Sequence, residues 1–120
     1  MTKLTYKQAV EAVEKAIEYR GADHIAPECE IYAYDDMWVH GKKLPVCIVG
    51  QALYELVGYE KFQFVCAGFV EDPAYSLGFE PTERATLFLK TAQAVQDEKY
   101  TWGEALKRAK KAVKAFDKAE

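Results

Sequence analysis

The amino-acid sequence predicts one α+β domain, in which helices pack on a small antiparallel β-hairpin or three-stranded ribbon. Apolar residues recur at helical spacing near both ends of the chain, and residues 29–34 alternate as a strand does. Half of the 120 residues are hydrophobic, which is enough for a single packed core. The expected order over residues 1–120 is α-β-β-α-(β)-α-α, with an N-terminal helix, a central helix and a C-terminal helical hairpin.

The first helix is expected from Thr5 to Arg20. Thr5 and Gln8 have the spacing of a capping box, and Gly21 stands where a C-terminal glycine cap belongs. The apolar stripe consists of Tyr6, Val10, Val13 and Ile17, widened by Ala9 and Ala16. This pattern is typical of an amphipathic helix that packs on a core.

A β-hairpin is expected to follow. In C-E-I-Y-A-Y (29–34) side chains alternate with the period of a strand, and M-W-V-H (37–40) is expected to form the returning strand. Asp35-Asp36 is predicted to turn the chain between them. Because a two-stranded ribbon is marginal alone, the helices should cover it.

The central helix is expected from about residue 48 to Gly58, after L-P-V-C (44–47). Residues 59–80 are the least readable part of the chain. F-Q-F-V-C (62–66) alternates like a short strand, and D-P-A-Y-S-L-G (72–78) is predicted to be a loop.

The last third of the sequence is predicted to form two antiparallel helices, because the linker D-E-K-Y (97–100) between them is short. The first helix, from about Thr82 to Asp97, has an apolar stripe of Ala85, Phe88, Leu89, Ala92 and Val95. Thr101 and Glu104 form a second capping-box pattern. The helix that follows has a stripe of Trp102, Leu106, Ala109, Val113 and Phe116.

Composition excludes several classes of protein. No apolar run reaches the roughly 18 residues of a membrane span, and the N-terminus lacks the apolar core of a signal peptide. We therefore expect a cytoplasmic protein with reduced thiols and no membrane partner. The only serine, Ser76, lacks the glycine-flanked turn of a nucleophilic serine.

Four segments together resemble a loose group of small hypothetical proteins of actinobacteria and of the bacteriophages that infect them. The segments are Y-K-Q-A-V, C-E-I-Y, P-V-C-I-V-G-Q-A-L-Y-E-L and A-Q-A-V-Q-D-E-K-Y-T-W-G-E-A. The resemblance leaves out residues 59–80. It implies a phage-encoded or prophage-like protein in the host cytoplasm. The group has no assigned activity, so the resemblance implies no catalytic residues.

Cys47 is a candidate thiol site, because a cysteine at a helix N-terminus faces the positive end of the helix dipole. The alternative interpretation is a small buried side chain at a joint between hairpin and helix. A zinc site could be formed by His24, Cys29, His40 and Cys47, although their spacings lack the tight pairs of structural zinc sites. We favour a protein without a metal, a cofactor or enzymatic activity.

The C-terminal helix is a candidate nucleic-acid interface. Residues 99–120 carry seven basic and three acidic side chains, a net charge of +4, so the rest carries −7 within a total of −3. A stripe opposite the apolar face consists of Lys107, Lys111, Lys114 and Lys118. Such a stripe could neutralise phosphates, or it could simply be a solvated helix face.

The surplus of aromatic residues favours protein–protein contact as the main function, either with an unidentified partner or between two copies as a homodimer. Aromatic side chains anchor many protein interfaces, although they also fill cores. The candidate contact residues lie in the hairpin and in residues 59–80. They are Tyr34, Trp38, Tyr59, Phe62, Phe64, Phe69 and Tyr75.

Overall fold

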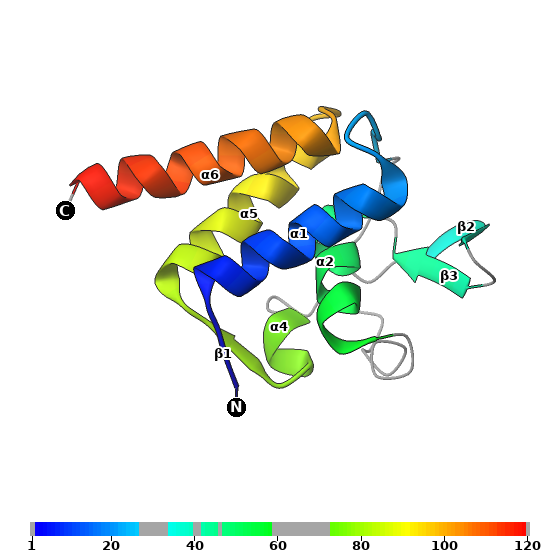
Figure 1. Ribbon diagram of the computed structural model, residues 1–120, viewed down its shortest axis with the longest axis horizontal. Helices are drawn as coiled ribbons and strands as arrows, with labels where there is room; N and C mark the ends of the chain where they lie inside the picture. Colours follow the sequence, from blue (N-terminus) through cyan, green and yellow to red (C-terminus); the bar gives the residue numbers. More distant parts are fainter. Residues whose placement is uncertain (1, 27–33, 40–41, 46, 59–72, 120) are drawn as a thin grey trace.

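Four long helices form most of the described structure, and they pack directly on one another (Figure 1). The computed structural model describes residues 2–26, 34–39, 42–45, 47–58 and 73–119. The long helices are α1 (Tyr6–Arg20), α2 (Ile48–Val57), α5 (Glu83–Asp97) and α6 (Trp102–Ala119). The shorter elements are β1 (Thr2–Leu4), β2 (Tyr34–Val39), β3 (Lys42–Pro45), α4 (Pro73–Ser76) and β4 (Phe79–Pro81).

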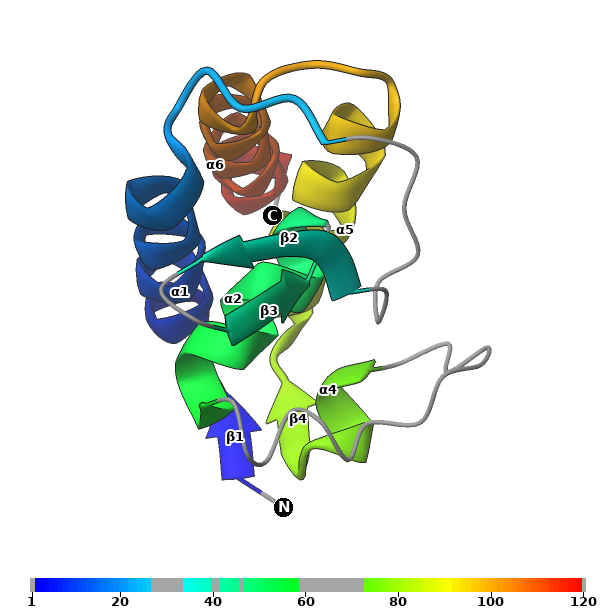
Figure 2. The same ribbon diagram turned by 90° about the vertical axis from the view of Figure 1, so that its right-hand side faces the viewer.

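The predicted fold class, a ribbon covered by helices, is wrong. Helices α1, α2, α5 and α6 pack on each other, and the small sheet beside their ends is the parallel pair β1–β4. The antiparallel pair β2–β3 lies at the side of the molecule (Figure 1), where β3 contacts α2 and the pair stands in front of that helix in Figure 2. The helical core is therefore the centre of the fold, since Leu4 joins it from β1 and the rest comes mainly from the four helices.

The predicted strand boundaries are also wrong. Asp35 and Asp36 do not turn the chain, because both lie inside β2. The register places Tyr34 opposite Pro45 and Val39 opposite Lys42, so the returning strand is β3. The strands predicted at 29–33 and 62–66 lie outside the described residues.

The parallel pair β1–β4 joins two distant parts of the chain. Thr2 stands opposite Phe79, and Leu4 stands opposite Pro81. The backbone N–H of Thr82 donates to the carbonyl of Leu4 at 2.9 Å, which continues the pairing to the start of α5. Because each strand leads directly into a helix, α1 and α5 start side by side and run in the same direction (Figure 1).

Local signals set the starts of three helices as predicted. At Thr5 both hydrogen bonds of the capping box are present, at 3.2 Å and 2.9 Å to Gln8. The Thr82 hydroxyl accepts from the N–H of Ala85 at 3.1 Å, and Thr101 accepts from Glu104 at 3.1 Å. These bonds satisfy N–H groups that a helix start leaves without an intrahelical partner.

The predicted antiparallel pairing of the last two helices is confirmed. Helices α5 and α6 form the most extensive contact between described elements, and α6 runs back along α5 (Figure 1). The loop predicted for residues 72–78 is wrong in part, because Pro73–Ser76 forms the short helix α4. Proline fits the first position of a helix, where its missing N–H costs nothing.

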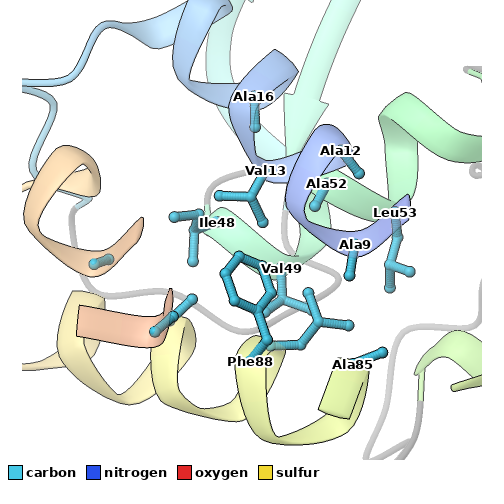
Figure 3. Close-up of a cluster of buried hydrophobic side chains, with 14 of the residues drawn as sticks. Ala9, Ala12, Val13, Ala16, Ile48, Val49, Ala52, Leu53, Ala85 and Phe88 are labelled. Atoms are coloured by element: carbon cyan, nitrogen blue, oxygen red, sulfur yellow. The ribbon is translucent and has the colours of Figure 1, made fainter. Parts of the chain in front are cut away.

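The core is centred on Phe88 of α5. Its ring is fully buried and points toward Val13 of α1 and toward Ile48 and Val49 of α2 (Figure 3). The surrounding faces are rich in small side chains, which let the helix backbones approach closely. The buried alanines of the long helices are Ala9, Ala12, Ala16, Ala52, Ala85, Ala92, Ala105 and Ala109.

Candidate functional site

The outer face of α6 carries the most distinctive surface feature of the described chain. The inner face is buried through Trp102, Ala105, Ala109 and Val113, which fixes the orientation of the helix. The opposite face presents four exposed side chains, Lys107, Lys111, Lys114 and Lys118, called the lysine stripe below. At 3.6 residues per turn and 1.5 Å per residue, they fall within about 60° of the circumference and span about 16 Å.

The basic residues beside the stripe are paired with acids. Arg108 Nε donates to Glu104 Oε1 at 2.9 Å, and Lys110 Nζ lies 3.8 Å from Glu14 Oε2 on α1. The hydrogen bond that Arg108 donates to Glu104 raises the pKa of Arg108, and a weaker contribution comes from Tyr100, whose ring lies 4.0 Å from the guanidinium. The charges that flank the stripe are therefore largely balanced within the fold.

The lysine stripe itself has no such balance. Within the described residues, none of its four ammonium groups makes an ion pair. Like charges four residues apart on a helix cost about 0.2 to 0.5 kcal/mol per pair. The helix dipole favours a cation in the last turn, which explains Lys118 but not Lys107 or Lys111. The presence of four lysines on one face is therefore not explained by the stability of the helix itself.

A groove lies beside the C-terminal end of α6, where it meets the starts of α1 and α5. Its volume is about 590 Å³, and its lining residues are Thr5, Tyr6, Thr82, Glu83, Arg84, Phe116 and Asp117. Arg84 Nε donates to Asp117 Oδ1 at 2.6 Å. Burial raises the pKa of the Tyr6 phenol, and the negative charge of Asp117 adds to that effect. The charges of Arg84 and Asp117 are thus balanced by each other, whereas the carboxylate of Glu83 adds a negative charge to the groove.

Cys47 occupies the N-cap position of α2, as the sequence predicts, and its side chain is 0% exposed. The first N–H groups of α2 donate to glutamines of α5. Ile48 N donates to Gln96 Oε1 at 2.6 Å, and Val49 N donates to Gln93 Oε1 at 3.4 Å. The positive end of this helix dipole is therefore occupied by amide oxygens, and solvent does not reach the thiol.

We predict that iodoacetamide modifies Cys47 in the native protein roughly 100-fold or more slowly than in urea, since modification requires the core to open. Peptide mapping by mass spectrometry measures the label on Cys47 separately from the label on Cys29 and Cys66. Native labelling of Cys47 at the rate of an accessible thiol would contradict the burial and revive the thiol-enzyme hypothesis.

Two of the four residues of the predicted zinc set can be placed. His24 packs edge-on against Trp102, with ring centroids 4.7 Å apart, and Cys47 is buried at the start of α2. Cys29 and His40 lie outside the described residues. Within the part of the chain that the structure describes, no three histidine, cysteine or acidic side chains group as metal ligands do.

The predicted aromatic contact surface is described only in part. Tyr75 of α4 is 44% exposed, and Tyr34 and Trp38 belong to β2. The remaining candidates, Tyr59, Phe62, Phe64 and Phe69, lie outside the described residues. Sequence reasoning missed the exposed Tyr19, Ile25 and Tyr100. Tyr100 is the last residue of the linker D-E-K-Y. An aromatic residue in a short polar linker could have been recognised in the sequence as an exposed ring, but only the length of this linker was considered.

No helix in the described ranges combines the length and apolar character needed to cross a membrane. Comparison with known protein families, curated proteins and solved structures finds no match to this chain. The resemblance to hypothetical proteins of actinobacteria and their phages stays a prediction. The charge on the outer face of α6, unpaired within the described residues, is therefore the basis of the proposed function.

Proposed function

We propose that the protein acts by binding nucleic acid, with the lysine stripe of α6 contacting phosphates. The observation that supports this proposal is the set of four exposed lysines on one helix face without ion pairs in the described chain. A row of ammonium groups releases counter-ions from a phosphate backbone when it binds, which supplies sequence-independent affinity. The proposal places this binding in the cytoplasm.

The net charge of −3 does not oppose binding at this face. Charges farther away than the Debye length of about 8 to 10 Å are screened at physiological salt. The acids next to the stripe are engaged locally, Glu104 by Arg108 and Asp117 by Arg84. A phosphate that approaches the stripe therefore meets the lysines as the dominant local charge.

Charge reversal tests the proposal. The variant Lys107→Glu/Lys111→Glu/Lys114→Glu is expected to abolish the gel shift of a 20-base-pair duplex at low salt. The matched control is Lys7→Glu/Lys15→Glu/Lys90→Glu, which changes the net charge equally on exposed sites of α1 and α5. This control is expected to retain most of the shift, and circular dichroism checks that both variants are folded.

Three outcomes contradict the proposal. One is the absence of any shift by the wild-type protein at low salt. Another is an equal loss of binding in the stripe variant and the control, which would make net charge the cause. The third is tighter binding to polyglutamate than to the duplex, which would point to an acidic protein as the partner.

Protein–protein contact is the second candidate function, and the exposure of Tyr75 is the observation that favours it. An aromatic ring left open to solvent at 44% is available to anchor a partner or a second copy. Native mass spectrometry tests self-association, because a dimer that is lost in Tyr75→Ala would support this function. A monomer at micromolar concentration would contradict the homodimer.

A further inference from the structure

From the geometry of α6, and resting on the proposed function, we infer the class of ligand and how it binds. The lysine stripe lies lengthwise along the phosphate backbone of a nucleic-acid duplex and binds it without regard to sequence. Duplex DNA and duplex RNA offer the same phosphate chemistry, and the experiment below distinguishes them.

The packed start of α6 excludes insertion of the helix end into a groove. Recognition helices read bases with their N-terminal residues. In this protein the segment after α1 covers that end (Figure 2). Trp102 N donates to the His24 carbonyl at 2.9 Å, and Gly103 N donates to the Ala22 carbonyl at 2.9 Å. A Cβ on residue 103 would lie 3.0 Å from the Ala22 oxygen, so no space remains there for a base pair.

The donor chemistry of the outer face suits phosphates better than base edges. Lysine can donate to guanine, but its compact charge on a flexible stem lacks the rigid, planar fork with which arginine fixes two hydrogen bonds to one base. The single arginine of α6, Arg108, is held by Glu104 and lies over the ring of Tyr100. The stripe itself therefore contributes mainly charge and lacks the rigid donor fork of arginine.

The aromatic residues of α6 point to a duplex and not to a single strand. Proteins that bind single strands stack bases on exposed aromatic rings beside a basic groove. Trp102 of α6 is 0% exposed, and Phe116 lines the groove at the far end of the helix. Between Lys107 and Lys118 the outer face offers lysines with no exposed ring among them.

The salt dependence of binding tests the inference. Fluorescence anisotropy would compare two 20-base-pair DNA duplexes of unrelated sequence, an RNA duplex and a single strand of equal length. Four phosphate contacts predict a slope of about −3.6 for log association constant against log salt on B-form DNA. Each of Lys107→Gln and Lys111→Gln should reduce the slope by about 1. We expect the two DNA duplexes to bind within about twofold, since phosphate contacts carry no sequence information.

Two outcomes would overturn the inference and leave the proposed function intact. These are tighter binding to the single strand, and a tenfold or larger preference between the DNA sequences. A slope that the two glutamine variants leave unchanged would contradict the role of the stripe in the proposed function as well. Tighter binding to duplex DNA, or to duplex RNA, supports the inference and identifies the source of the phosphates. The absence of binding to every probe at low salt refutes the proposed function as well.

Discussion

Replacement of Phe88 by alanine is expected to lower the free energy of unfolding by roughly 3 to 5 kcal/mol. The ring is fully buried where α1, α2 and α5 meet (Figure 3). It packs edge-on against Tyr6 at a centroid distance of 5.5 Å. Helical neighbours such as Val13 and Ile48 are fixed by their own packing, so they collapse only partly into the space left behind. The cost therefore includes a cavity as well as lost burial.

Urea unfolding followed by circular dichroism measures this loss. A domain of this size is typically stable by about 5 to 15 kcal/mol, so the variant should unfold at much lower urea. The matched control is Phe116→Ala, which removes the same ring from a half-exposed position beside the groove. An equal loss in both variants would show that Phe88 is not the centre of the core.

The sequence predicts the long helices well because their signals are local. A threonine cap and an apolar stripe were enough for α1, and an apolar stripe alone was enough for α5, which follows Thr82 as expected. In α6 the reciprocal half of the predicted capping box is replaced, since the Glu104 carboxylate accepts from Arg108. The inner stripe still holds, and Ala105 joins Trp102, Ala109 and Val113.

The architecture could not be predicted from the same signals. Strands β1 and β4 are three residues each, too short for an alternation to be recognised, and their pairing joins Thr2 to Phe79. Such a contact depends on where the helices bring the chain and not on local preference. Asp35 and Asp36 were assigned to a turn by residue type, whereas the pairing with β3 places them within β2.

The candidate site was predictable in its residues but not in its electrostatic environment. Spacing alone places Lys107, Lys111, Lys114 and Lys118 on one helix face. Sequence does not reveal that Lys110, next to the stripe, pairs with Glu14 in α1. The packing of α6 against α1 shows that Lys110 is paired, whereas the four lysines of the stripe are available to a ligand.

Replacement of Gln96 by leucine is expected to cost about 1 to 3 kcal/mol of unfolding free energy, although the two side chains have similar size. Gln96 is 1% exposed, and its amide oxygen accepts from the backbone N–H of Ile48 at 2.6 Å. The N–H at the first position of a helix has no intrahelical partner, and Cys47 is a poor cap. Leucine would leave that buried donor without its acceptor, which costs more than the average hydrogen bond contributes.

Gln93→Leu is the matched control for Gln96→Leu, one helical turn earlier on α5. Its amide oxygen accepts from Val49 N at 3.4 Å, in a part-buried position that solvent can reach, so the loss should be well below that of Gln96→Leu. Urea unfolding measures both variants, and iodoacetamide labelling of Cys47 reports whether the start of α2 loosens. Equal stability of Gln96→Leu and the wild type would contradict the assignment of Gln96 as the cap of α2. If Cys47 is labelled faster in Gln96→Leu but not in Gln93→Leu, then Gln96 keeps the start of α2 packed and the thiol inaccessible to solvent.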